Sequence, residues 1–130
     1  AMRPEDVPVY LNKSLTNLGL DYVDCYLVHG PIGCHRPPND NNAFPMTPEG
    51  QLDIDPSTDL VGIWHAMEDQ LDLGRTRSIG VSNFSIEQLR RVNRSAQRHK
   101  IAVHQIELHA EFQQKEQRAY CLRHDIAIMA

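Results

Sequence analysis

The 130-residue sequence predicts an α/β fold in which helices alternate with the strands of a parallel sheet. The first observation behind this prediction is that apolar residues recur at helical spacing in successive segments, each followed by a short apolar run typical of a buried strand. The second is that the alternation repeats, and repeated strand and helix units require parallel strands joined by right-handed crossovers. The third is that polar residues close several of the apolar runs.

A helix is expected first, in the segment that follows Pro4. Apolar residues over positions 7–18 recur at helical spacing, and Pro4 and Pro8 are tolerated only in a first helical turn. Gly19 is placed to end this helix, because glycine readily adopts the left-handed conformation that closes helices. The apolar run over residues 22–28 then predicts a strand.

The composition changes sharply between residues 30 and 58, where Pro, Asn, Asp and Gly dominate. This composition predicts a long irregular loop, and loops of such length inside compact domains are usually functional or mobile. Helical spacing returns over residues 60–71 and predicts a helix, which Asp59 opens with a negative charge and Gly74 closes.

The second half of the chain continues the alternation of strand and helix. Ser85 and Gln88 form a capping-box pattern ahead of Leu89, so a helix is expected to begin just past residues 82 and 83. Further strands are expected at residues 78–81, 103–108 and 126–130, and a weakly amphipathic helix at residues 113–124.

Polar side chains stand at the ends of successive predicted strands. His29 follows one strand, and Ser82 and Asn83 follow the next. Gln105 lies on the strand after that. Because side chains alternate between the faces of a strand, an inward-facing His29 places Asp24 on the opposite face, buried against the helices. Serine, asparagine and glutamine can together match a flat amide, and a nearby histidine can polarise a carbonyl.

Each of these polar residues also has a plainer explanation. A lone histidine at such a position is more often structural than catalytic. A serine before a helix is a common helix-entry residue, and an asparagine there is a common turn former. The functional interpretation therefore depends on the residues acting together from neighbouring strands.

Three stretches of the sequence form a recognisable set of motifs. Residues 20–31 read Leu-Asp-Tyr-Val-Asp-Cys-Tyr-Leu-Val-His-Gly-Pro, residues 80–84 read Gly-Val-Ser-Asn-Phe, and residues 104–107 read His-Gln-Ile-Glu. In this order and spacing they resemble the aldo-keto reductases. The resemblance implies a (β/α)8 TIM barrel, a fold that typically needs about 250 residues. Residues 1–130 are therefore expected to form an incomplete domain, about the middle half of the barrel, with residues 30–58 as a long loop on the substrate side.

The resemblance also implies an activity, the reduction of an aldehyde or ketone to an alcohol by hydride transfer from NADPH. The matching His29 is expected beside the carbonyl of this small-molecule substrate. Ser82, Asn83 and Gln105 are expected to hold the nicotinamide carboxamide of NADP(H). The family's catalytic Asp, Tyr and Lys would lie upstream of residue 1, so this chain alone is expected to be inactive. The alternative is a non-catalytic relative, a structural or channel-associated subunit that binds NADP without turnover.

Some residues depart from the family pattern. Gly30 stands where an aromatic residue usually follows the histidine and lines the substrate pocket. His104 replaces a common Asn, and Leu108 replaces a common Cys. These departures flank the motifs, so they bear on substrate preference more than on cofactor binding.

The composition argues against several classes of partner. A net charge of −4 without a polybasic run gives no electrostatic reason to expect nucleic acid or a membrane surface. Three widely spaced cysteines argue against a disulfide framework and fit a reducing compartment, so a cytoplasmic protein is expected. His99, His104 and His109 recur every five residues but straddle a loop and a strand, so no metal site is expected. The oligomeric state stays open, with a monomer favoured.

Overall fold

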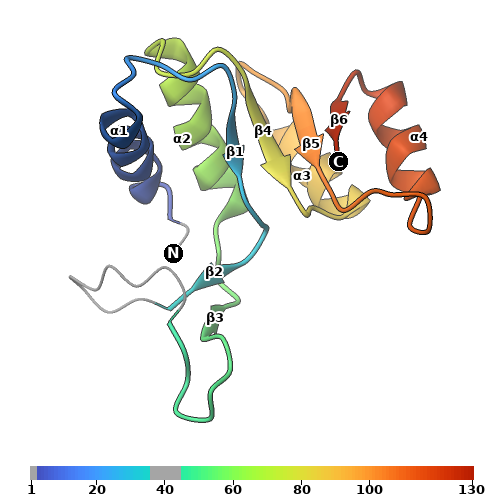
Figure 1. The fold of residues 1–130 in the computed structure, drawn as a ribbon, viewed down its shortest axis with the longest axis horizontal. Coiled ribbons are helices and arrows are strands. Elements are labelled where there is room, and N and C mark those ends of the chain that lie inside the picture. The colour runs from blue at the N-terminus through green and yellow to red at the C-terminus, as the bar shows by residue number, and fades with distance from the viewer. Residues whose placement is uncertain (1–2, 36–44) are drawn as a thin grey trace.

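A parallel sheet with helices packed behind it organises the chain. The computed structural model describes residues 3–35 and 45–130. The helices are α1 (Asp6–Leu18), α2 (Leu60–Asp72), α3 (Ile86–Ser95) and α4 (Lys115–Arg123), and the strands are β1 (Tyr26–Val28), β2 (Gly33–Cys34), β3 (Ile54–Asp55), β4 (Ile79–Ser82), β5 (Val103–Gln105) and β6 (Ala127–Met129). The main sheet is parallel and has the order β1, β4, β5, β6 (Figure 1). The predicted alternation of helices with parallel strands is therefore confirmed.

Helix α1 ends as its glycine predicts. Gly19 has a left-handed conformation with φ of 65°, and its N–H donates to the carbonyl oxygens at the end of the helix. The next N–H, from Leu20, donates to the carbonyl oxygen of Leu15 at 3.0 Å. These bonds satisfy carbonyl groups that the last helical turn leaves without partners.

Strand β1 is shorter than the apolar run that predicts it. The strand covers only Tyr26–Val28, and upstream of it Val23 makes a single isolated bridge to Thr76. Asp24 is exposed and pairs with Arg77 at 3.1 Å. The expectation of a buried Asp24 is therefore wrong, because residue 24 lies before the strand begins and the alternation of faces does not extend to it.

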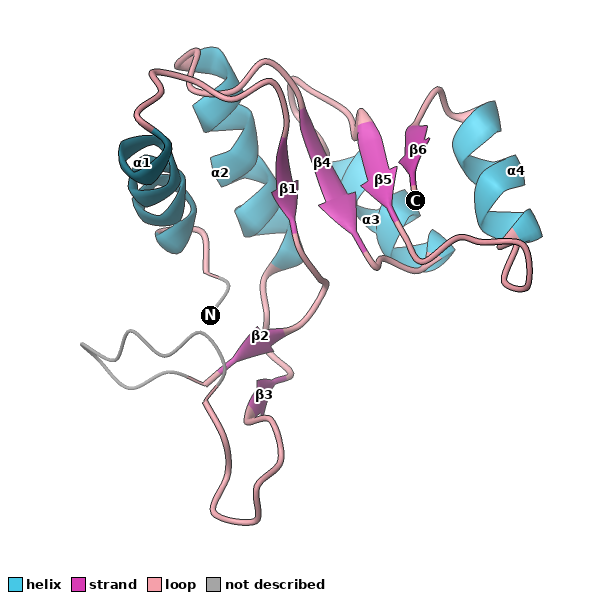
Figure 2. Cartoon of the chain, viewed as in Figure 1, coloured by secondary structure: helices cyan, strands magenta, loops and turns pink. Residues whose placement is uncertain are grey.

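The region expected as an irregular loop contains a small antiparallel sheet. Strands β2 and β3 pair Gly33 with Asp55 and Cys34 with Ile54 (Figure 2). The hydroxyl of Thr58 accepts the N–H of Gly33 at 2.9 Å and closes the base of this excursion. The described parts of the 30–58 segment are thus anchored at both ends, while residues 36–44 lie outside the described residues.

The caps of α2 and α3 form as the sequence predicts. A side-chain oxygen of Asp59 accepts the N–H of Gly62 at 2.9 Å and so caps α2. At α3, Ser85 and Gln88 form the reciprocal capping box, with distances of 2.8 and 3.3 Å. The second cap fixes where α3 begins, directly after the end of β4.

The two faces of the main sheet differ in burial. Val28, Val81 and His104 lie side by side in the register and face the helices, where they are buried. Gly80 faces the other way, since a Cβ atom added to it would meet the backbone oxygen of Val103 and lie 2.8 Å from the side chain of Leu27. Side chains therefore point alternately to the two faces of the sheet where these strands pair.

The core between sheet and helices centres on α2. Trp64 and Met67 are each 1% exposed and belong to the core between helix and sheet. The indole N–H of Trp64 donates to the carbonyl oxygen of His99 at 2.9 Å. This bond ties α2 to the loop between α3 and β5.

A buried carboxylate on α2 holds the same loop. Glu68 is 0% exposed, and one of its oxygens accepts the N–H groups of Gln97, Arg98 and His99 at 3.0, 2.8 and 2.8 Å. Burial alone would raise the pKa of this carboxyl, but the three N–H donors and the Arg98 guanidinium lower it below its ordinary value. The loop before β5 is thus fixed by a charged acceptor.

Candidate active site

The predicted site residues come together at the C-terminal end of the parallel sheet. In the register, Val28 lies opposite Val81, which places His29 beside the level of Ser82. Ser82 lies opposite Gln105, and Gln105 lies opposite Met129. All of these residues end or follow their strands, so the sheet collects them along one rim.

Asn83 connects the ends of three strands. Its side-chain Nδ2 donates to the backbone oxygen of His29 at 3.0 Å and to the hydroxyl oxygen of Ser82 at 3.0 Å. Its backbone N–H donates to the backbone oxygen of Gln105 at 3.0 Å. Asn83 has φ of 60°, the left-handed region that asparagine tolerates better than most residues. The turn-forming role weighed from the sequence is therefore real, and it brings the amide to the rim.

Several polar atoms around this turn can still form hydrogen bonds. Within the described residues, Asn83 Oδ1 and Gln105 Oε1 accept no hydrogen bond. The hydroxyl of Ser82 accepts from Asn83 and so keeps its own proton to donate. The site thus offers two amide oxygens as acceptors and one hydroxyl as donor, the complement of a planar amide that carries one oxygen and two N–H hydrogens.

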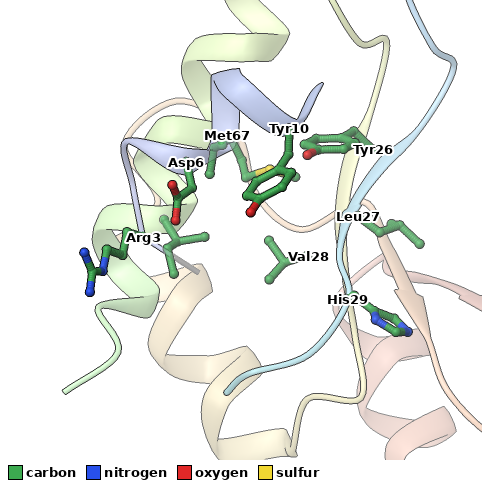
Figure 3. Close-up of a pocket in the computed structure, with 10 residues that line it drawn as sticks. Arg3, Asp6, Tyr10, Tyr26, Leu27, Val28, His29 and Met67 are labelled. Atoms are coloured by element: carbon green, nitrogen blue, oxygen red, sulfur yellow. The ribbon is translucent and has the colours of Figure 1, made fainter. Parts of the chain in front are cut away.

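His29 lies on the same side of β1 as Leu27, which points away from the helices. Figure 3 shows Leu27 and His29 on one side of the strand and Val28 on the other, towards Tyr10 and Met67. His29 is exposed, and its ring makes no hydrogen bond with any described residue. The imidazole is therefore available to a ligand at the rim.

A cavity of about 180 Å³ lies on the opposite side of β1, between this strand and helices α1 and α2 (Figure 3). Its lining is mostly apolar and includes Val28, Ile63 and Met67. Burial, reinforced by the nearby Tyr10, raises the pKa of the Tyr26 phenol here. Although His29 is among the residues that line this cavity, its ring points to the other side of β1, so the candidate site is the rim and not the cavity (Figure 3).

Two contacts of strand β5 and its neighbours were not predicted from the sequence. Met129 lies opposite Gln105 in the register, and its sulfur accepts from Gln105 Nε2 at 2.9 Å. His104 lies on the helix side and accepts the N–H of Phe84 at 3.2 Å. Both contacts depend on strand register, which the sequence pattern does not specify.

The described parts of the chain also bear on metal binding, membrane insertion and cysteine chemistry. Among those residues, no three His, Cys, Asp or Glu side chains lie close enough together to hold a metal ion. None of the described helices has the length and apolar character needed to cross a bilayer. Cys25, Cys34 and Cys121 are all free thiols.

Comparison with known proteins identifies relatives along the whole chain. The family model described as the aldo/keto reductase family matches residues 1–130. Dihydrodiol dehydrogenase 3 and prostaglandin F synthase 1, both from Bos taurus, are each 40% identical to this chain over 131 residues. These matches cover 100% of this chain and 39% of each relative, so the chain spans about two fifths of their length.

Solved structures share the fold. An aldose reductase from Schistosoma japonicum superposes with a TM-score of 0.91 at 34% identity, covering 98% of this chain and 41% of that one. An aldose reductase from Giardia lamblia gives a TM-score of 0.90 at 31% identity, with the same coverage. Together with the parallel strands and alternating helices, this similarity shows that the chain forms part of a (β/α)8 barrel, as the sequence predicts.

Proposed function

Because the chain belongs to the aldo/keto reductase family, we propose that the full-length protein reduces an aldehyde or ketone to an alcohol with NADPH. The observation that carries this proposal is the meeting of His29, Asn83 and Gln105 at one rim, with polar groups left free. The proposal concerns the full-length protein, since the chain covers 39% of relatives such as dihydrodiol dehydrogenase 3. By itself, the chain is proposed to be inactive.

The polar groups of the turn after β4 are proposed to hold the nicotinamide carboxamide. The hydroxyl of Ser82 donates to the carboxamide oxygen, while the free oxygens of Asn83 and Gln105 accept its N–H groups. Three contacts from two neighbouring strands fix the plane of the ring, and such orientation can contribute several kcal/mol to catalysis. The bound nicotinamide supplies the hydride.

His29 is proposed to orient and polarise the substrate carbonyl. Its ring is exposed on the side of the sheet where Leu27 points, and it has no competing hydrogen bond within the described residues. Its backbone oxygen is held by Asn83, so the amide that faces the carboxamide also fixes the strand end that carries the histidine. Carbonyl and cofactor are thereby placed relative to each other.

The substrate pocket is proposed to be wide beside His29. A Cβ atom at Gly30, where the family usually has an aromatic residue, would meet no described atom within 4 Å. The anchored segment with β2 and β3 begins only a few residues further on and continues past the end of β1 (Figure 1). A substrate bulkier than a simple aldehyde fits this arrangement.

The test of the proposal is NADPH consumption by the full-length protein with a generic aldehyde such as 4-nitrobenzaldehyde. Turnover that saturates with aldehyde is expected. Tight NADPH binding without turnover on a panel of aldehydes and ketones would instead favour a non-catalytic relative that keeps the fold and the cofactor. Failure to bind NADPH at all would refute both the cofactor assignment and the roles of Ser82, Asn83 and Gln105.

The setting proposed for this activity is a cytoplasmic monomer acting on a small molecule. The free thiols Cys25, Cys34 and Cys121 support a reducing compartment. The net charge of −4 supports neither nucleic acid nor an anionic membrane surface as a partner. Size-exclusion chromatography with light scattering tests the monomer directly.

A further inference from the structure

His104 is a fully buried polar residue to which the proposed chemistry assigns no role. It lies on β5 immediately before Gln105, and the alternation of the strand sends the two side chains to opposite faces of the sheet. Gln105 reaches the rim, whereas His104 is 0% exposed between the sheet and α4. A buried imidazole in such a position requires hydrogen-bond partners.

The partners of His104 fix its protonation state. Its Nε2 accepts the backbone N–H of Phe84 at 3.2 Å, so this nitrogen carries no proton. In the neutral ring the proton is then on Nδ1, which lies 3.8 Å from the sulfur of Cys121 on α4. Burial lowers the pKa of His104 and raises the pKa of the Cys121 thiol, so both groups are neutral.

The N–H that His104 accepts belongs to the turn that carries Asn83. Asn83 is held with φ of 60°, and its own N–H donates to the backbone oxygen of Gln105. The next N–H, from Phe84, donates to His104 on the helix side. Consecutive N–H groups of the turn are therefore bound by consecutive residues of β5. Phe84 is also held at its backbone oxygen by Gln117 of α4 at 3.1 Å.

We propose that His104 is a positioning residue for the carbonyl reduction proposed above. By holding the N–H of Phe84 from the helix side, it fixes the left-handed turn at Asn83 and so aims Asn83 Oδ1 at the nicotinamide carboxamide. His104 itself touches neither cofactor nor substrate, because its side chain faces away from the rim. The inference rests on the proposed function.

The test compares the binding of two ligands by the full-length protein. NADP+ carries the carboxamide, whereas its 3-acetylpyridine analogue has a methyl ketone there and lacks the amide N–H groups. In H104L the buried N–H of Phe84 loses its acceptor, and affinity for NADP+ is expected to fall about tenfold while affinity for the analogue falls less than about twofold. A residue with a purely structural role would weaken both ligands equally and leave their affinity ratio unchanged.

Two further variants control this comparison. H104Q retains an acceptor near the position of Nε2, so its ratio of NADP+ affinity to analogue affinity is expected to stay within about 1.5-fold of the wild-type value. C121V removes the acceptor of the Nδ1 proton without changing any residue of the turn itself. The imidazole then holds the N–H of Phe84 less firmly, so the affinity ratio of NADP+ to its analogue is expected to fall about threefold. If H104L fails to fold, C121V tests the positioning role of His104 in its place.

The outcomes separate this inference from the function on which it rests. A wild-type protein that binds neither ligand refutes the proposed function, and the positioning role fails with it. If the wild-type protein binds both ligands but H104L leaves the affinity ratio of NADP+ to its analogue unchanged, the positioning role alone is overturned. Where H104L does not fold, an unchanged affinity ratio in C121V has the same consequence. An affinity ratio of NADP+ to its analogue that falls in H104L and returns to the wild-type value in H104Q supports the positioning role.

Discussion

The buried carboxylate of Glu68 provides a quantitative test of how the loop before β5 is held. One oxygen of Glu68 accepts three backbone N–H groups at 2.8 to 3.0 Å. Hydrogen bonds to charged groups contribute about 1.5–3 kcal/mol each when both partners are desolvated. Gln97 and Arg98 are exposed, so their freed N–H groups can bind water, and about 1 kcal/mol per bond is the appropriate value.

Glu68→Ala should therefore lower the free energy of unfolding by about 3 kcal/mol from the lost bonds, and by about 1 kcal/mol more from the lost packing of the methylene groups. Glu68→Gln keeps an acceptor oxygen but loses the charge, and charge-assisted bonds are roughly twice as strong as neutral ones, so a loss of about 1.5 kcal/mol is expected. Urea denaturation of the full-length protein followed by circular dichroism measures both values.

The neighbouring Asp69 supplies a matched control. Its carboxylate pairs with Arg98 at 2.6 Å, but its side chain is 61% exposed, and exposed ion pairs contribute little. Asp69→Asn should cost less than about 1 kcal/mol. Equal losses in Glu68→Gln and Asp69→Asn would refute the reasoning, because they would mean that burial and the three N–H donors add nothing to the interaction.

The same carboxylate predicts a dependence on pH. Because the folded state lowers the pKa of Glu68 below the ordinary value of 4.5, its contribution to stability is complete above that pH and is lost as the pH falls through the folded-state pKa. The difference in unfolding free energy between wild type and Glu68→Gln should be constant from about pH 6 to 8 and should shrink below about pH 4.5. A difference that persists unchanged to about pH 3 would contradict the assignment.

Three other substitutions test the rim and the sheet. His29→Ala should lower the turnover number of the full-length protein by about 100-fold while leaving NADPH affinity nearly unchanged, and an unaltered turnover number would contradict its role at the carbonyl. Asn83→Ala should weaken NADPH binding about tenfold in a fluorescence titration, and equal affinity and rate would remove the carboxamide assignment. Gly80→Ala should destabilise the protein by about 3 kcal/mol in urea denaturation, since its Cβ would meet the backbone oxygen of Val103. Gly30→Ala is the control, expected within about 0.5 kcal/mol of wild type because its Cβ would meet nothing within 4 Å, and equal losses in the two alanine variants would show that the sheet relaxes around residue 80.

The helices of this chain could be predicted because their signals are local. The Gly19 stop and the Ser85 capping box each depend on residues within one turn of the helix end, and both form as expected. Strand length was harder to predict, because a residue belongs to a strand only where a partner lies opposite. The apolar run over residues 22–28 therefore yields a strand of three residues, and Asp24 lies outside it.

The small sheet of β2 and β3 had no signal that a pattern could detect. Each strand has two residues, which is too short for an alternation of apolar and polar side chains to be recognised. Its pairing also joins residues about twenty positions apart, Cys34 and Ile54. Composition predicted the excursion correctly as a departure from regular structure, but only tertiary contacts determine that it folds back on itself.

At the strand ends, the direction of each side chain could be predicted from the sequence, but its contacts could not. Alternation on β5 places Gln105 towards the rim and the preceding residue towards the helices, and both placements hold. Alternation does not predict which groups His104 contacts on the helix side. Its ring contacts the N–H of Phe84, just past the end of the neighbouring strand, and the sulfur of Cys121 on the following helix. In the sequence alone, the equal spacing of His99, His104 and His109 suggests no function other than metal binding. Once folded, the middle one is a neutral acceptor, which follows from its burial and from the N–H group that only the parallel register brings to it.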